Sequence, residues 1–398
     1  MRLLVVMTHY PFPPLGGSAI VAYNSMKYLS KHHSIDFICF QPTSALVQPT
    51  VFVERQVLVP QRKVSRVARW MRHVPYLLAD VPMSVSTFTF RAMKKTVKEA
   101  IGLGKYDAIL LFDMSAIRYC PPSCYNKLIV NIEDPQSLKL NRMVQLPVWS
   151  FWQKTKLFVL ARLAANYENR ILPKMAKVIL LSVADIKDMR EQSGYDNLVH
   201  VPYGVDQRDS AEIACYEDRE KIIIYSGSMY HPPNVDGALF LLRDIFPLIL
   251  QQYPAAILWI VGADPDDRIY DAAAKFGKQV LIMGRVADVA NYIKRATVSI
   301  CPVRLKIGVQ TKILEALSLG TPVVTTSAGN SGVGGVSGTH LWVEDDPHLL
   351  AQRVLSLLQG HNWSQLSKEG RRFAAEHFSW KGSVAQLERY LESLVVTN

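Results

Sequence analysis

The chain has 398 residues, of which 49% are hydrophobic and 20% charged, and its formal net charge is +11. This length suits two domains of roughly 150–200 residues each, and the composition excludes a disordered or fibrous chain. No apolar stretch approaches the roughly 20 residues that a membrane-spanning helix needs. The five cysteines are mostly scattered, which favours reduced thiols over a disulfide framework or a metal site.

The chain opens with a βαβ pattern. Arg2–Met7 predicts a buried strand rather than a signal peptide, because its apolar run is short and soon meets His9. A loop rich in proline and glycine follows, then a helix over about residues 19–30 and a strand over Ser34–Phe40. Gly17 and the glycine before it stand at the strand-to-helix turn. Turns use glycine often, so this pair alone is a weak sign of function.

Most of the positive charge lies in the first half of the chain. Gln61–Lys98 holds nine Lys or Arg against one acid, and Lys139–Lys177 holds eight against one. Such surfaces attract anionic lipid, nucleic acid or an anionic substrate. Over Val64–Met71 apolar residues recur at helical spacing between arginines, beside Trp70. This pattern predicts either a helix lying on a membrane or an amphipathic helix packed on its own domain.

Two further apolar runs predict buried parallel strands, Tyr106–Phe112 and Lys127–Ile132. Polar residues follow each strand, and ligands of open α/β sheets bind at the carboxyl ends of strands. The alternative is that these side chains only cap the helices that come next. His9, after the first strand, is either a pocket residue or an ordinary strand-end histidine. The acceptor-side candidates are His9, then Asp113 and Ser115 after the first of these strands, and Glu133, Asp134 and Ser137 after the second.

The remaining elements alternate in the same way. A long helix is expected over Leu146–Leu172, and a strand over Ala176–Leu181 leads to a helix capped by Ser182. Further strands are expected at Ile222–Tyr225, Ala256–Gly262, Val280–Met283, Val298–Pro302, Pro322–Thr325 and Leu341–Val343. Further helices are expected at Phe90–Ile101, Val235–Leu242, Asp288–Arg295, Val309–Leu319 and Ser383–Val395.

One stretch, Cys301–Thr326, combines a strand end, a loop and a helix start. The loop carries Arg304 and the flexible Gly308, and the helix start directs unpaired backbone N–H groups outward, which favours an anion. Lys312 and Glu315 share one helical face. A cation beside these amides and a carboxylate one turn later suit a nucleoside diphosphate. The alternative is an ordinary helix with a solvated Lys–Glu pair.

The motif P-x-R…G…K-x-x-E-A-x-x-x-G-x-P-V-V, over Pro302–Val324, resembles the donor-binding signature of glycosyltransferase family 4, whose members have the two-domain GT-B fold. Tyr225–Asn234 resembles a bacterial branch of that family found with exopolysaccharide genes. Val201–Asp206 resembles its hinge, and Phe378–Trp380 resembles the crossover after which the last helix packs back on the first domain. The resemblance covers nearly the whole chain.

The resemblance implies two Rossmann-like, doubly wound α/β domains that face each other across a cleft. Residues 1–204 form the acceptor-side domain, with 380–398 packing back on it, and residues 205–379 bind the nucleotide sugar. Family members carry a second glutamate where this chain has Ile307, so the usual contact to the transferred sugar does not carry over. The implied donor-binding residues are Glu315 at the ribose, Gly308, Val309, Gln310 and Thr311 at the phosphates, Gly17, Gly227 and Ser228 in glycine turns, and Arg285 at the nucleobase.

We therefore expect a metal-independent, retaining glycosyltransferase without cofactor. It would move a sugar from a nucleotide-sugar donor to a glycan, lipid-linked or small-molecule acceptor in polysaccharide or glycoconjugate biosynthesis. Arg304 and Lys312 are the expected catalytic residues, because they stabilise the charge of the leaving diphosphate. We expect a cytoplasmic protein, peripheral on an anionic membrane, with no nucleic-acid partner. Two alternatives stay open: a sugar-nucleotide 2-epimerase of the same fold, and a basic protein that binds nucleic acid or other anions.

Overall fold

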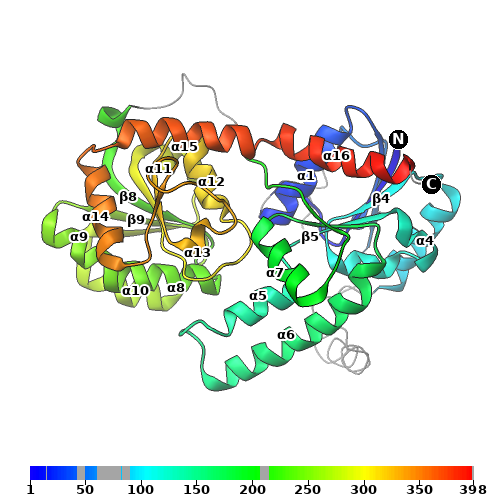
Figure 1. The fold of residues 1–398 in the computed structure, drawn as a ribbon, viewed down its shortest axis with the longest axis horizontal. Coiled ribbons are helices and arrows are strands. Elements are labelled where there is room, and N and C mark those ends of the chain that lie inside the picture. Colours follow the sequence, from blue (N-terminus) through cyan, green and yellow to red (C-terminus); the bar gives the residue numbers. More distant parts are fainter. Residues whose placement is uncertain (15, 43–49, 61–81, 83–89, 207–214, 397–398) are drawn as a thin grey trace. The chain divides into compact units, whose positions relative to one another are not determined.

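The computed structural model describes residues 1–14, 16–42, 50–60, 82, 90–206 and 215–396. The basic helix predicted over Val64–Met71 lies outside these residues. The chain divides into two compact units (Figure 1). The first unit comprises Met1–Asn141, Thr155–Gly204 and Trp380–Asn398, and the second comprises Arg142–Lys154 and Val205–Ser379. The segment 142–154 thus groups with the second unit, whereas the sequence prediction assigned it to the first.

The first unit is built on a parallel sheet of seven strands in the order β3-β2-β1-β4-β5-β6-β7. The central strands are buried apolar runs, as expected for a sheet covered on both faces. The strands are β1 (Arg2–Met7), β2 (Ser34–Phe40), β3 (Arg55–Val59), β4 (Ala108–Leu111), β5 (Leu128–Glu133), β6 (Lys177–Leu180) and β7 (Leu198–His200). The helices are α1 (Gly17–Leu29), α4 (Arg91–Leu103), α5 (Gln136–Met143), α6 (Phe151–Ile171), α7 (Val183–Ser193) and α16 (Trp380–Val396).

The second unit repeats this plan with six parallel strands in the order β10-β9-β8-β11-β12-β13. Its strands are β8 (Glu220–Ser226), β9 (Ile257–Val261), β10 (Val280–Gly284), β11 (Ala296–Cys301), β12 (Val323–Thr325) and β13 (Trp342–Val343). Its helices are α8 (Pro232–Phe240), α9 (Phe246–Gln252), α10 (Asp267–Ala273), α11 (Val289–Arg295), α12 (Thr311–Ser318), α13 (Ser327–Asn330), α14 (Pro347–Leu358) and α15 (Trp363–His377). The predicted doubly wound α/β architecture is confirmed for each unit.

Two predicted helix starts were wrong. The helix expected over Leu146–Leu172 begins only at Phe151, and Pro147 accounts for the absence of helix at Leu146 alone. At the true start the Ser150 N–H donates to the side chain of Gln153 at 2.8 Å. The helix expected over Val309–Leu319 is the shorter α12, since its N-cap Gln310 has non-helical backbone angles. The loop before α12 is therefore longer than predicted.

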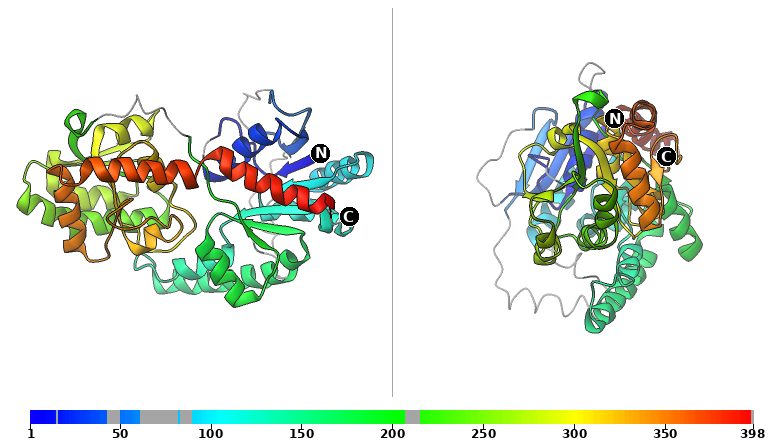
Figure 2. Two further views of the ribbon diagram at one scale, coloured as in Figure 1. Left: turned by 45° about the horizontal axis from the view of Figure 1, so that its top comes forward. Right: turned by 90° about the vertical axis from the view of Figure 1, so that its left-hand side faces the viewer.

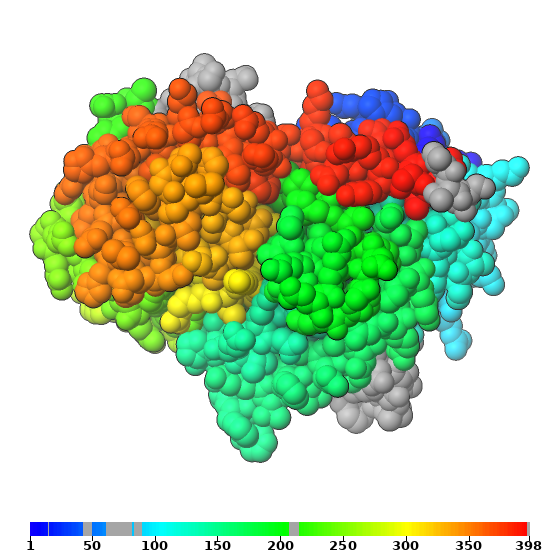
Figure 3. Space-filling model, in the orientation of Figure 1, coloured from blue at the N-terminus to red at the C-terminus, as the bar shows by residue number. Residues whose placement is uncertain are grey.

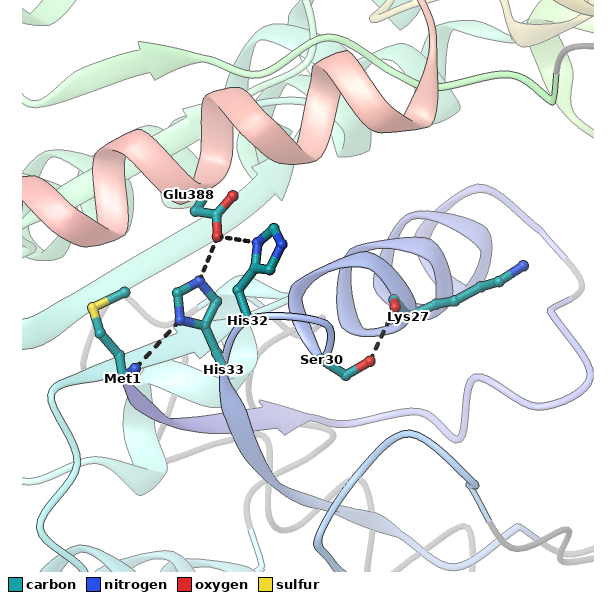
Figure 4. A network of polar contacts seen from close by, with 6 residues as sticks. All are labelled: Met1, Lys27, Ser30, His32, His33 and Glu388. Atoms are coloured by element: carbon teal, nitrogen blue, oxygen red, sulfur yellow. Dashed lines mark hydrogen bonds and ion pairs between the residues drawn. The ribbon is translucent and has the colours of Figure 1, made fainter.

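The C-terminal helix α16 belongs to the first unit and lies alongside α1 (Figures 1 and 2). Its Glu388 accepts hydrogen bonds from the rings of His32, at 2.9 Å, and His33, at 2.8 Å (Figure 4). At its start, Trp380 covers Gly204 so closely that a Cβ there would lie 2.2 Å from the indole. The helix is thus fixed to the unit by apolar packing at one end and by polar contacts nearer the other.

Candidate functional site

The strand order of the second sheet creates a crevice between β8 and β11. The chain leaves β8 towards β9 on one side and leaves β11 towards β12 on the other. The loops after these two neighbouring strands therefore diverge, and ligands of open α/β sheets bind at such switch points. Gly227 follows β8, while Arg304, Gly308 and Lys312 follow β11. The fold thus brings together two segments about 80 residues apart that the sequence singled out separately.

Lys312 is the central cation of this crevice, with only 8% of the residue exposed. Its ammonium donates to Oδ1 of Asn234 at 2.5 Å and lies 5.0 Å from the ring centre of Tyr225. Asn234 is held in turn, because its Nδ2 donates to the carbonyl of Ser228 at 3.0 Å. Burial lowers the pKa of Lys312. A buried ammonium hydrogen-bonded to a neutral amide favours an anionic ligand beside it.

Glycine at position 227 keeps this crevice open. A Cβ there would lie 3.0 Å from the Lys312 ammonium and 3.0 Å from the Asn234 amide, and the backbone φ is +147°. Behind it, a Cβ on Gly262 would come within 1.6 Å of the Gly227 carbonyl. The hydroxyl of Ser226 is buried and has no partner among the residues that the structure describes. Ser228, also predicted for the donor, is exposed at the end of the turn.

The backbone before α12 supplies hydrogen-bond donors. The N–H groups of Val309, Gln310 and Thr311 find no acceptor within the described part of the chain. Gly308 precedes them with a φ of +50°, a conformation that glycine adopts without strain. Its carbonyl is so close to Gly332 that a Cβ there would lie 2.1 Å away. Free amides at a helix start together with the Lys312 ammonium form an anion site.

Glu315 lies one turn further along α12 and is half-buried. Its carboxylate accepts no hydrogen bond from any residue that the structure describes. Burial raises its pKa to about 7, and the nearby Lys312 ammonium acts in the opposite direction. A buried carboxylate without a donor partner is costly to keep ionised, so this position fits a ligand that brings hydroxyl groups.

Arg304 is held by a residue that the sequence analysis did not select. Asp236 of α8 is buried, and its two oxygens accept from Nη2 and Nε of Arg304 at 2.6 and 2.9 Å. The guanidinium also lies 4.8 Å from the ring centre of Phe240, and 42% of the side chain is exposed. Arg304 is therefore a fixed cation whose charge is partly compensated. Lys312 has no such carboxylate among its hydrogen-bond partners.

Arg285, the predicted nucleobase residue, directly follows β10. The carbonyl of Gly284 before it accepts from the Gly262 N–H at 2.9 Å, which ties the end of β10 to the turn after β9. The Arg285 side chain itself is largely exposed and pairs with Asp264 at 3.6 Å. A role for Arg285 would therefore depend on its backbone more than on its charge.

The first unit contains a pocket of about 180 Å³ at the ends of β4 and β5. Four of the six acceptor-side candidates line it together: Asp113, Ser115, Glu133 and Asp134. His9 does not line it, and its ring nitrogen lies 3.0 Å from the hydroxyl of Thr8. Gly17 is the first residue of α1, next to Ser18 of the pocket wall.

Asp113 has a structural role. Its carboxylate accepts from the N–H and hydroxyl of Thr8, both at 2.9 Å, and from the N–H of Ala116 at 2.9 Å. It thus ties the end of β1 to the end of β4 and caps the short helix after β4, the alternative considered from the sequence. Asp134 pairs with Lys139 at 3.9 Å.

Glu133 is a further acceptor-side candidate in this pocket. It stands at the end of β5 with a φ of +57°, which is unusual for a residue with a side chain. Its Oε2 accepts from the hydroxyl of Ser18 at 3.0 Å, and its Oε1 is buried without a partner among the described residues. Burial raises its pKa to about 7, and the neighbouring Asp134 acts in the same direction. Strained backbone and an unpaired buried oxygen both mark a ligand-binding position.

Comparison with known proteins supports the same assignment. Residues 220–360 match the family model described as glycosyl transferases group 1. A phosphatidyl-myo-inositol mannosyltransferase of Mycobacterium tuberculosis is 24% identical over 247 residues, which cover 57% of this chain and 63% of that protein. The matched region therefore spans less than two thirds of this curated relative.

Solved structures match over the full length. Sucrose-phosphate synthase of Thermosynechococcus elongatus has a TM-score of 0.72 at 17% identity, covering 100% of both chains. HepE of Anabaena, solved with UDP and glucose, has a TM-score of 0.66 at 14% identity, covering 98% of this chain and 99% of that one. The predicted GT-B fold class and the recognition of a family 4-type glycosyltransferase are confirmed. Neither the epimerase nor the nucleic-acid alternative is favoured by these matches.

Proposed function

We propose that the protein transfers a sugar, with retention of configuration, from a nucleotide-sugar donor to an acceptor of polysaccharide or glycoconjugate biosynthesis. The observation that carries the proposal is the arrangement on α12. An anion site of three free amides and Lys312 is followed, one turn later, by the unpaired carboxylate of Glu315. This order matches the order of diphosphate and ribose in a nucleoside diphosphate. HepE, with its bound UDP and glucose, supports such a donor.

The chemistry requires stabilisation of a leaving diphosphate. Lys312 and the amides of Val309–Thr311 would bind the phosphate oxygens, and the Asp236-held Arg304 would add a donor in fixed orientation. Because these groups are already in place, they need little reorganisation as negative charge grows on the diphosphate. The diphosphate can then take the proton of the acceptor hydroxyl on the same face of the sugar. That no metal takes part stays a prediction.

The first-unit pocket is the proposed acceptor site. Glu133 offers an unpaired oxygen, and Ser18, Ser115 and Asp134 line the same space. Carboxyl and hydroxyl groups suit the hydroxyls of a glycan or of a polyol headgroup. Within the described residues no helix is long and apolar enough to cross a membrane. We also propose that the protein associates peripherally with a membrane that holds a lipid-linked acceptor.

A donor screen tests this function. The purified protein is heated with UDP, GDP and ADP and with their common sugar conjugates, and the unfolding midpoint is recorded. A ligand at 100 times its dissociation constant stabilises by about 2.7 kcal/mol, or about 5–10 °C for a unit of this size. Glu315→Ala should abolish the shift, and Lys278→Met, which removes an exposed cation of the same unit, should keep it.

The reaction product separates the remaining classes. Incubation with the stabilising sugar nucleotide and an acceptor extract should release free nucleoside diphosphate. A rearranged sugar nucleotide without nucleotide release would instead identify an epimerase. If no nucleotide or sugar nucleotide shifts the midpoint of the wild-type protein, the proposed donor site is wrong.

A further inference from the structure

Helix α6 carries a group of apolar side chains that are exposed to solvent. Phe151, Trp152, Phe158 and Val159 are 74%, 78%, 61% and 52% exposed. Single exposed apolar residues are ordinary, but four within nine residues of one helix are a patch of the kind that marks an interaction site. Figure 3 shows the surface of α6, coloured teal, below the centre of the view. These four residues are called the α6 face below.

Helical geometry places these four side chains together. At about 100° per residue they fall within a sector of roughly 120°. The buried residues Ala161, Ala164 and Tyr167 fall on the opposite side. The helix therefore has two apolar sides, one packed on its own unit and one turned to solvent. A helix that is apolar all round is normally buried, so the second side indicates an apolar partner.

The charges around the α6 face have one sign. Lys154 and Lys156 flank the sector, each about 40° outside one edge, and Arg162 lies within it one turn beyond Phe158. None of these three cations forms an ion pair with any residue that the structure describes. Glu168 is the single acid of α6; it is buried and accepts from the N–H of Gln136 at 2.8 Å.

We propose that the α6 face docks the protein on an anionic lipid bilayer. Aromatic rings at the level of the headgroups, with lysines on both flanks that can extend towards phosphates, are the arrangement of a helix lying in a membrane interface. The face extends about 16 Å along the helix from Phe151 to Arg162. An acidic protein groove or a second copy of the chain would be the other occupants. The proposal assigns a surface to the peripheral association proposed above, but it does not depend on the proposed sugar transfer.

Vesicle binding by the full-length protein tests the proposal. Sedimentation with phosphatidylcholine vesicles is compared with vesicles that also contain phosphatidylglycerol. Wild type should bind the anionic vesicles only and dissociate at high salt. The double variant Trp152→Ser, Phe158→Ser should partition about tenfold or more weakly. Each of Lys154→Gln, Lys156→Gln and Arg162→Gln should weaken partition about fivefold.

Two controls make the result specific. The variant Tyr270→Ser, Leu349→Ser removes two exposed apolar side chains of the second unit and should bind vesicles like wild type. The tryptophan emission of wild type should shift to shorter wavelength on anionic vesicles, and this shift should shrink in Trp152→Phe although that variant still sediments. Unchanged unfolding midpoints in all variants show that the fold is kept.

Three outcomes would overturn the proposal. The first is wild-type protein that does not sediment with anionic vesicles, or sediments equally with neutral ones. The second is binding that survives the Trp152→Ser, Phe158→Ser change and is lost only when Arg62, Arg66, Arg69 and Arg72 are replaced. The third is a lipid-free dimer that this double change converts to monomer, which would make the α6 face a contact between copies.

Discussion

Replacing Glu315 by glutamine should stabilise the second unit at alkaline pH while it weakens donor binding. The pKa of this carboxyl rises from 4.5 to about 7 on folding because the group is buried. The folded state therefore holds the proton over a range in which the unfolded state has lost it. Stability is unaffected below pH 4.5, falls as pH rises towards 7, and is constant above that.

The size of the effect follows from the shift. At about 1.36 kcal/mol for each pH unit, a shift of this size costs at most about 3 kcal/mol above pH 7. Lys312 reduces the gain from the substitution, because the negative charge of Glu315 raises the pKa of that lysine and favours its ammonium form. We therefore expect Glu315→Gln to gain about 1–3 kcal/mol at pH 8, which is about 2–10 °C in the midpoint of a unit of this size.

The assay is thermal unfolding of wild type and variant at pH 5 and pH 8, without ligand. The variant should unfold at a higher temperature than wild type at pH 8 and near the same temperature at pH 5. Glu217→Gln, which removes an exposed carboxyl from the same unit, corrects for the change in net charge. An equal difference at both pH values, or a variant less stable at pH 8, would refute the assignment of Glu315 as a buried carboxylate kept for a ligand.

Four other substitutions probe the two units. Lys312→Met should lower kcat/KM for the donor about 10–150-fold, which is the equivalent of about 1.5–3 kcal/mol for a charged hydrogen bond. Initial rates are measured for this variant and for the control Lys278→Met. An equal loss in both variants would show that the effect is only structural. Asp236→Asn should lower kcat by about as much as Arg304→Ala does. The double variant should be no slower than either single variant, because both changes act through one ion pair. A kcat of the double variant that falls by the product of the two single losses would contradict this. Glu133→Gln should flatten the pH dependence of the acceptor KM between pH 6 and 8. The reason is that the pKa of Glu133 is about 7 and its ionised form accepts hydrogen bonds from hydroxyl groups. If the variant has the same pH dependence as wild type, Glu133 does not bind the acceptor. Gly204→Ala should destabilise the first unit by about 1–3 kcal/mol through overpacking, because the added Cβ would lie 2.2 Å from Trp380. An unchanged unfolding midpoint would show that Trp380 can move aside without cost.

The positions of most strands could be predicted from the sequence alone. Buried parallel strands are short apolar runs bounded by turn residues, and β1, β4, β5 and β11 all have that form. Helix ends were predicted less well, because they depend on single residues. Pro147 disfavours helix at Leu146, and the non-helical conformation of Gln310 makes α12 begin at Thr311.

Only those residues of the candidate site that lie close together in the sequence could be predicted. Lys312, Glu315 and the amides before them belong to one turn of helix, so their spacing in the sequence fixes their geometry. The pairing of Arg304 with Asp236 joins residues 68 positions apart and depends on how α8 packs against the loop after β11. The raised pKa of Glu133 likewise arises from burial that only the folded unit creates. No local pattern could have revealed either.

The first unit is assembled from stretches of chain that are far apart, and this has a consequence for its synthesis. Leu387 and Leu391 of α16 are buried, and Glu388 bonds His32 and His33 beside α1. While residues 1–379 leave the ribosome, the surface that α16 later covers stays open, although the second unit can already fold. The N-terminal half of the chain is therefore completed last. Until then the apolar surface that α16 covers is exposed, and exposed apolar surface of this kind is prone to aggregation.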